Sequence, residues 1–551
     1  MEQLHFFQLT GEDALGRRLS PAEDLPAPRS GRQVGMFYFL WHEPQKNGLI
    51  GRFDEMLRMH DKAQLSGRDS LFYRLPWGTP HFWAEPLYGF YSSDDEWVIR
   101  RHVELLTMAG IDFLIIDATN LLAFVPQALV LMRVLHDYRA QGFDAPKIMF
   151  YTHTDSAERM QQLYDGIYRM RRYPDTWFCL RGKPAIVGDA AAASPEVAAF
   201  FTIKAAQWPN EPDRVGGFPW MDFARPQRLF ANADGSESIV NVSVAQNSSD
   251  RCRFGDSVLY GETGNRGRSF RDGAAHITPE SYYYGDNFRE QWERAIALDP
   301  EMVFVTGWNE WIAGVWSGED DRPAAIFDCI DGEYSRDIEP MRGGYGDAYY
   351  LQLADYVRRY KGVPHGGTDA AVPDDAPIAS TAGIPVLRHF PGAARAHDAQ
   401  GYVGRLTAPA GRNEITATYA AHDGSGWRLI AACDAALQPA DGRGEWMRPY
   451  LRVPGGERSP LGYTHYVDTA AADGGSAPLY RYRADGWQPA GRVPCTVTSQ
   501  GVAVHLPFAL TDPQTLRSKW VDSVQTYDGP MAFYEHGSVA PAGRFDQIVR
   551  R

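Results

Sequence analysis

Asn309 and Glu310, which lie between Trp308 and Trp311, are the residues best suited to chemistry. They follow an apolar run, 302–306, with no polar alternation, which is typical of a strand buried on both faces of a parallel sheet. Indole rings offer flat surfaces to sugars, and a carboxylate at a strand end can act as acid, base or nucleophile. The pattern predicts a sugar site in which Glu310 is catalytic, Asn309 and the two tryptophans bind substrate, and Glu310 faces an open cleft. The alternative is a structural glutamate that pairs with an arginine or caps a helix.

Polar and aromatic residues also end three other predicted strands, at 34–41, 111–117 and 147–153. These residues are Trp41, His42, Asp117, Tyr151 and His153. Asp117 is a candidate catalytic carboxylate, and the other four are candidates to bind hydroxyl groups or to carry protons. For each of them, a hydrogen-bonded residue at the rim of the sheet is an equally good interpretation.

Cleavage between sugars normally uses two carboxyl groups, one of them with a raised pKa. For the second carboxyl group we favour Glu262 slightly over Asp117, because Glu262 lies in a Gly-rich loop with Arg266 and Arg268. Such a loop can fold over a cleft, and its arginines can hold an acidic sugar. The structural alternative is a loop braced by salt bridges.

Strand and helix patterns alternate from residue 34 to 306, with helices expected near 96–109, 125–140 and 286–296. Crossovers of this length indicate a parallel sheet. The candidate catalytic and substrate-binding residues at the strand ends favour a (β/α)₈ (TIM) barrel. A doubly wound open sheet is the rival, but no Gly-rich phosphate loop follows the first strand. The seventh strand, expected at 256–262, has the weakest pattern.

The composition divides the 551 residues into four parts. Residues 1–33 read as an irregular N-terminal segment and 34–362 as the catalytic barrel. Residues 363–383 are rich in Gly, Ala, Pro and Asp and read as a linker. Short β-like runs separated by turns then predict a β-sandwich over 384–551.

Charge and composition narrow the range of partners. A formal net charge of −14 argues against nucleic acid or an anionic membrane surface, and no apolar run is long enough to span a membrane. The five cysteines lack metal-site spacing, and no motif indicates a cofactor. The N-terminus does not read as a signal peptide, so we expect either a trimmed leader on an extracytoplasmic protein or a cytoplasmic one. The sequence does not indicate an oligomeric state.

The segment 307–314 (GWNEWIAG) resembles the WNEWxEG signature of glycoside hydrolase family 99-like proteins, a group that includes family 99 endo-mannosidases, family 71 glucanases and WbsX-like bacterial proteins. The segments 37–42, 77–80, 110–114 and 334–340 are similar to the same group, so the resemblance covers about 34–362. The tail is similar to the sandwich of bacterial relatives and, distantly, to family 9 carbohydrate-binding modules.

The resemblance implies a barrel glycosidase with two catalytic glutamates on this loop. Glu310 matches the first, but Ala313 stands at the position of the second. We therefore expect a glycoside hydrolase acting on a poly- or oligosaccharide, with another carboxylate in place of the second glutamate. One alternative is a lyase for uronic-acid-containing glycans, with Tyr151 or His153 as base. The other is a glycan-binding protein without catalysis.

Overall fold

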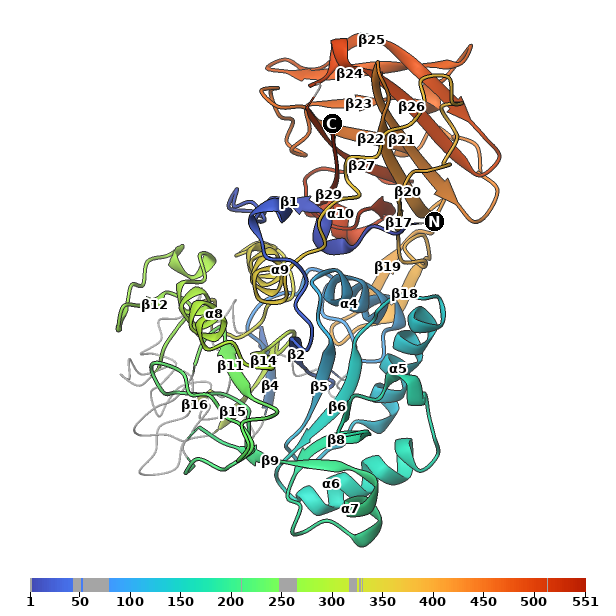
Figure 1. The fold of residues 1–551 in the computed structure, drawn as a ribbon. Coiled ribbons are helices and arrows are strands. Elements are labelled where there is room, and N and C mark those ends of the chain that lie inside the picture. Colours follow the sequence, from blue (N-terminus) through green and yellow to red (C-terminus); the bar gives the residue numbers. More distant parts are fainter. Residues whose placement is uncertain are drawn as a thin grey trace. The chain divides into compact units, whose positions relative to one another are not determined.

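The computed structural model describes residues 2–42, 51–52, 79–209, 211–246, 265–316, 325–326, 329, 331–512 and 514–551. The chain divides into two compact units, both drawn in Figure 1. The barrel unit comprises Arg29–Lys361 and Gln400–Arg405. The sandwich unit comprises Met1–Pro28, Gly362–Ala399 and Leu406–Arg551.

The barrel unit is built on a nearly closed sheet of parallel strands. In chain order they are β2 (Gln33–Tyr38), β5 (Phe113–Ala118), β6 (Lys147–Thr152), β8 (Lys183–Gly188), β9 (Thr202–Gln207), β10 (Phe218–Pro219), β11 (Ile239–Ser243) and β14 (Met302–Thr306). Consecutive strands from β2 to β10 pair in parallel, and the last strand, β14, pairs with both β11 and β2. Within the described residues, the ladder is interrupted between β10 and β11. The predicted TIM barrel is therefore confirmed.

Helices and shorter strands complete the barrel unit. The helices are α4 (Glu96–Met108), α5 (Val125–Ala140), α6 (Ser156–Leu163), α7 (Pro195–Phe200), α8 (Asp286–Leu298) and α9 (Ala348–Lys361). The shorter strands are β3 (Gly51–Arg52), β4 (Thr79–Phe82), β7 (Cys179–Leu180), β12 (Phe270–Arg271), β13 (Ala274–Ala275), β15 (Ile312–Trp316) and β16 (Ala325–Ile326). Asp95 caps α4 by accepting hydrogen bonds from Trp97 N and Val98 N.

Apolar side chains that point into the barrel explain why these strands close around one another. Phe37, Phe113, Ile115, Met149 and Phe304 belong to one buried cluster. They come from four strands, and Phe113 and Ile115 are two positions apart, as expected for one face of a strand. The cluster fills the barrel and supports the strand ends above it.

The sixth barrel strand, β10, is one that the sequence does not reveal. The runs 202–208 and 238–245 are consecutive strand-like segments of the sequence, but β10 lies between the strands that they form, so the second run becomes the seventh strand, β11. β10 has only two residues, too few to show a periodic pattern. The strand expected at 256–262 falls outside the described residues.

The sandwich unit contains a large, mostly antiparallel sheet. Its strands are β1 (Thr10–Gly11), β17 (Val386–Arg388), β20 (Ile415–His422), β21 (Gly426–Cys433), β22 (Glu445–Arg452), β23 (His465–Val467), β24 (Ser476–Arg483), β25 (Gly486–Val497), β26 (Gly501–Pro507), β27 (Thr515–Ser523), β28 (Ser538–Ala540) and β29 (Phe545–Arg550). A short helix, α10 (Ala532–Glu535), precedes β28. The strands β18 (His397–Gln400) and β19 (Arg405–Ala408) include the points at which the chain leaves and re-enters this unit.

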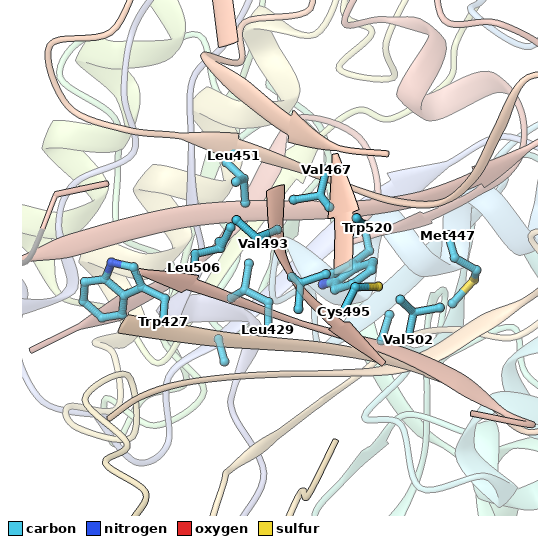
Figure 2. Packing of buried hydrophobic residues seen from close by; sticks show 14 of the residues in the cluster. Trp427, Leu429, Met447, Leu451, Val467, Val493, Cys495, Val502, Leu506 and Trp520 are labelled. Carbon is cyan, nitrogen blue, oxygen red and sulfur yellow. The ribbon is translucent and has the colours of Figure 1, made fainter. Parts of the chain in front are cut away.

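The sandwich has its own hydrophobic core, shown in Figure 2. Trp427 and Leu429 come from β21, Met447 from β22, and Trp520 from β27, and all four side chains are buried. Large apolar groups from strands that are far apart in the strand order therefore pack together, as the two layers of a β-sandwich do.

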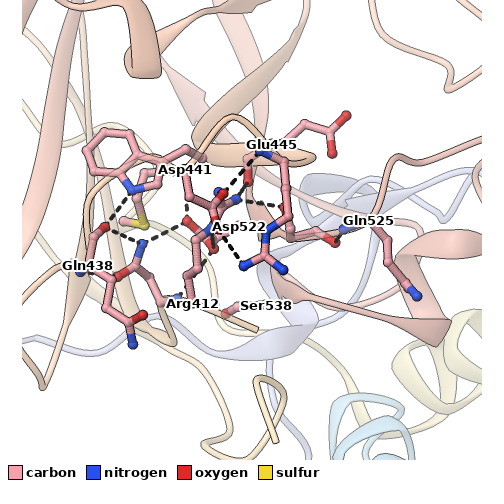
Figure 3. Close-up of polar contacts among 12 residues, drawn as sticks. Arg412, Gln438, Asp441, Glu445, Asp522, Gln525 and Ser538 are labelled. Carbon is pink, nitrogen blue, oxygen red and sulfur yellow. Dashed lines mark hydrogen bonds and ion pairs between the residues drawn. The ribbon is translucent and has the colours of Figure 1, made fainter. Parts of the chain in front are cut away.

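A buried arginine joins several loops of the sandwich, as Figure 3 shows. Arg412 donates to Asp441 Oδ1 at 2.6 Å and to the backbone carbonyls of Glu445 and Ser523, each at 2.7 Å. Asp522 lies 3.4 Å away and also accepts from Asn413. Arg412 thus ties the start of β22 to the end of β27 through backbone carbonyls.

The segment expected to be a linker is hydrogen-bonded to the sandwich. Val372 N donates to His422 O at 2.9 Å, and His422 N donates to Ala370 O at 2.9 Å. The Arg428 side chain donates to the carbonyls of Pro373 and Ala376 at 3.1 and 2.6 Å. Residues 370–376 are therefore attached to β20 and β21 rather than extended between units.

The N-terminal residues are also structured. Thr10 and Gly11 of β1 pair with Asp546 and Phe545 of β29. Arg544 donates to the carbonyls of Glu12 and Asp13 at 2.6 and 2.8 Å. The segment 1–33 was expected to be irregular, and its first 28 residues belong to the sandwich unit.

Within the described part of the chain, the helices are all too short or too polar to cross a membrane.

Candidate active site at the barrel strand ends

Glu310 follows β14 and is buried, with 1% of its surface exposed. Its Oε2 accepts hydrogen bonds from Arg336 Nε at 2.7 Å and from the Arg336 terminal nitrogen at 2.6 Å. This geometry is a two-point guanidinium–carboxylate ion pair. Glu310 was expected to face an open cleft, but it is buried. Its pairing with Arg336 matches the alternative of a structural glutamate that pairs with an arginine.

The neighbours of Glu310 are buried too. Asn309 Oδ1 accepts from Phe39 N at 2.9 Å, and its Nδ2 donates to Phe39 O at 3.2 Å, which ties the end of β14 to the end of β2. Trp311 stacks on Trp83 at 5.2 Å between ring centroids and donates to Glu339 Oε2 at 2.6 Å. Trp308 is fully buried. These side chains position the loop and do not present free indole faces.

Glu339 is the centre of a buried polar network that the sequence analysis did not identify. Besides Trp311, its carboxylate accepts from Tyr91 OH at 2.7 Å and lies 2.9 Å from His102 Nε2. His102 Nδ1 is in turn 2.9 Å from Tyr38 OH. The network links the loop after β14 to α4 and β2, which is a bracing role.

Asp337 is the second carboxyl in this region with unusual surroundings. It is fully buried, and its Oδ2 accepts from Trp83 Nε1 at 2.6 Å. Burial raises the pKa of Asp337 to about 7, although the positive charges of Arg268 and Arg336 oppose the shift. The sequence signal was the Arg-Asp-x-Glu run at 336–339, which resembles an ordinary loop brace.

Of the two other candidate carboxylates, Asp117 and Glu262, only Asp117 lies within the described residues. Asp117 is buried at the end of β5, and its Oδ1 accepts from Thr119 N at 2.9 Å, so it shapes its own turn. Glu262 lies outside the described residues. The backbone of Ala313 lies in β15, where it pairs with His81 of β4.

Two of the predicted hydroxyl-binding residues are structural in their contacts. His42 is fully buried, its ring Nδ1 is 3.3 Å from Ser93 Oγ, and burial lowers its pKa to about 3. Tyr151 OH donates to Phe218 O at 2.8 Å and accepts from Gln207 N at 3.2 Å. Burial raises the pKa of Tyr151 far above its usual value, so it is poorly suited to act as the base of a lyase.

Trp41 and His153 instead lie among aromatic side chains at the carboxyl ends of the strands. We call these residues the aromatic group: Phe39, Trp41, His153, Trp208 and Trp220. Trp41 is partly exposed and stacks on Phe39 at 4.9 Å. His153 is exposed and meets Trp208 edge to face at 4.4 Å, and Trp208 lies 5.0 Å from Trp220. Trp208 and Trp220 were missed as site residues; Trp208 directly follows β9, so an aromatic residue after a strand was the available signal.

Trp220 connects the aromatic group to the ion pair. The guanidinium carbon of Arg336 lies 5.1 Å from the centroid of the Trp220 ring, a cation–π distance. Arg336 therefore contacts Glu310 on one side and the aromatic group on the other. Among the described residues, His, Cys, Asp and Glu side chains form no cluster able to hold a metal ion.

The chain matches no family model and no curated protein. Among solved structures, it is similar to two of the family 99 endo-alpha-mannosidase from Bacteroides thetaiotaomicron, one of them in complex with bis-tris propane. Each comparison gives 15% identity over 60% of this chain and 97% of the other, with TM-scores of 0.34 and 0.32. Similarity at this level does not establish a family or an activity.

Proposed function

We propose that the barrel unit binds a carbohydrate at the carboxyl ends of its strands and hydrolyses a glycosidic bond there. The observation that carries the proposal is Trp220, which contacts Trp208 and lies under the Arg336 guanidinium that holds Glu310. Trp208 is partly exposed, and it is connected through the buried Trp220 and Arg336 to the Glu310 carboxylate, an arrangement suited to recognition and cleavage of a sugar.

The two carboxyl groups have the contrast that acid–base catalysis needs. Glu310 is a carboxylate in its pair with Arg336 and is suited to act as base or nucleophile. Asp337, whose pKa burial raises to about 7, holds a proton more readily than an exposed aspartate and is suited to act as the acid. Glu262 remains a candidate for the same role, and the hydrogen bond from Thr119 makes Asp117 a weaker one.

The burial of Glu310, together with Ala313, favours one other function: glycan binding without hydrolysis. A buried ion pair is a normal way to brace a loop, and an alanine cannot protonate a leaving group. In this case the aromatic group alone binds sugar.

One experiment separates these functions. The purified chain is incubated with a panel of neutral and acidic oligosaccharides, and products and binding are both measured. New reducing ends support hydrolysis, and unsaturated uronides support the lyase. Binding without product supports the non-catalytic function, and a Trp208→Ala variant that binds every sugar as well as the parent chain contradicts both carbohydrate proposals.

A further inference from the structure

Four arginines line a cavity of about 420 Å³ in the sandwich unit. These arginines are Arg18, Arg452, Arg458 and Arg517. The volume lies within the usual range for small-molecule sites. The whole chain carries a formal net charge of −14, so a cationic cavity is unusual for its surface.

Two of these arginines lie directly opposite each other on neighbouring strands. Arg452 ends β22 and pairs in register with Arg517 of β27. In an antiparallel pair, opposed residues point to the same face, and like charges placed there repel each other. The arrangement is therefore costly unless negative charge is supplied nearby.

Carboxylates supply only part of that charge. Glu12 is shared among three arginines, at 3.3 Å from Arg18, 3.1 Å from Arg452 and 2.8 Å from Arg458. Asp546 is 4.0 Å from Arg452 and also accepts a hydrogen bond from a tyrosine. Four guanidinium groups thus face two carboxylates.

Arg517 is the arginine of these four that forms no ion pair with either carboxylate. In the part of the chain that the structure describes, its side chain makes no ion pair or hydrogen bond. Burial lowers the pKa of Arg517, and the charges of Arg452 and Arg18 act in the same direction, while Asp546 and Glu12 oppose them. A half-buried cation that lacks a counterion has donors available to a ligand.

We propose that this cavity binds an oxyanion, namely a carboxylate, sulfate or phosphate group, through Arg517 and the neighbouring arginines. A guanidinium offers paired N–H donors whose spacing matches two oxygens of such a group. The Pro454-Gly455-Gly456 turn forms part of the lining without any large side chain, which leaves room for the rest of the ligand. The site lies in a different unit from the aromatic group of the barrel and does not depend on barrel activity.

The test is calorimetric titration of the full chain with sodium sulfate, sodium phosphate, sodium glucuronate and glucose at fixed ionic strength. We expect at least one of the three anions to bind with one site per chain, glucose to show no binding there, and added NaCl to weaken the binding. Glucuronate binding would indicate an acidic sugar as ligand, whereas binding of sulfate or phosphate alone would indicate a sulfated or phosphorylated one.

Arg517→Gln should weaken anion binding about tenfold or more, because it removes a charged donor pair. Arg443→Gln is the matched control, since Arg443 is an exposed arginine of the same unit that does not line the cavity. Without ligand, Arg517→Gln should keep or raise the melting temperature, because it relieves repulsion from Arg452. The proposal is overturned if no anion binds, if glucose competes equally, or if Arg517→Gln binds anions as the parent chain does. A lowered melting temperature with unchanged affinity would make Arg517 a structural residue instead.

Discussion

The ion pair between Glu310 and Arg336 determines what a substitution at either position does. Glu310→Gln removes the charge but leaves a buried guanidinium without its counterion, which costs about 3–5 kcal/mol of stability. If Glu310 is catalytic, the same variant should also lose several orders of magnitude in rate. Urea unfolding and the release of reducing ends measure the two effects separately.

The control for this prediction is the double variant Glu310→Gln/Arg336→Met. Removing both charges should recover much of the lost stability, because neither partner is then left buried and unpaired. It should not recover activity. A Glu310→Gln chain that is folded and keeps most of its activity would contradict the catalytic role.

Asp337 gives a prediction in the pH dependence of stability. Its pKa is about 7 in the folded chain against 3.8 for an ordinary aspartate, so between these values the folded state holds a proton that the unfolded chain has released. Stability supplied by this group is therefore lost as pH rises through that window. Asp337→Asn removes the titration, and its stability relative to the parent chain should improve between pH 5 and pH 8 by on the order of 2–3 kcal/mol.

Asp144→Asn is the comparison for that measurement, because the Asp144 side chain is 99% exposed. It should follow the parent chain across the same pH range. A constant difference in unfolding free energy between Asp337→Asn and the parent chain would mean that Asp337 is ionised throughout. It would then be unsuitable as the acid.

At the residue scale, the sequence predicted a glutamate just after an apolar strand, and Glu310 follows β14. It did not predict which side chains Glu310 contacts. Arg336, which pairs with Glu310, lies 26 residues further along the chain. Trp83, which donates a hydrogen bond to Asp337, is 254 residues away from it in the sequence. No local pattern specifies such pairs, so burial and pKa shifts had to come from the fold.

At the element scale, buried parallel strands were predictable because each is a continuous apolar run long enough to show its pattern. α8 was predictable too, since Phe288, Trp292 and Ala295 repeat at helical spacing and are all buried. The two-residue β10 was not, because its place is set by pairing with β9. Composition alone also does not show that the segment 370–376 is hydrogen-bonded to Arg428.

Arg428 makes that attachment testable. Its guanidinium binds the carbonyls of Pro373, Asp374 and Ala376, and it also pairs with Asp423 at 2.7 Å. We expect limited proteolysis to spare 370–376 in the parent chain, since a protease needs the backbone to open locally. Arg428→Met should expose the segment to cleavage, detected by mass spectrometry of the fragments. Arg443→Met should not, and rapid cleavage of the parent chain there would contradict the attachment.

At the scale of the whole molecule, the sandwich unit combines the first 28 residues with the C-terminal part of the chain. A domain boundary placed at residue 34, where the composition of the sequence changes, leaves the N-terminal residues outside both the barrel and the sandwich. The structure assigns them by pairing: Leu4 N donates to Val386 O at 2.8 Å, and Val386 N donates to Glu2 O at 2.9 Å. Along the chain, the two segments of the barrel unit separate the three segments of the sandwich unit.

This organisation predicts how fragments behave. Residues 362–551 alone should be less stable than the same fragment fused after 1–28 through a flexible linker. The fusion restores the β1–β29 pairing and buried side chains such as Leu4 and Leu19, each worth about 1.5–3 kcal/mol. The difference in unfolding free energy, measured in urea, should therefore be several kcal/mol. A fusion that carries Leu4→Ser and Leu19→Ser is the control and should lose most of the gain, because it keeps the added chain but not its buried contacts. Equal midpoints for the fragment and the fusion would show that 1–28 does not stabilise the sandwich, and the boundary at residue 34 would then be the better one.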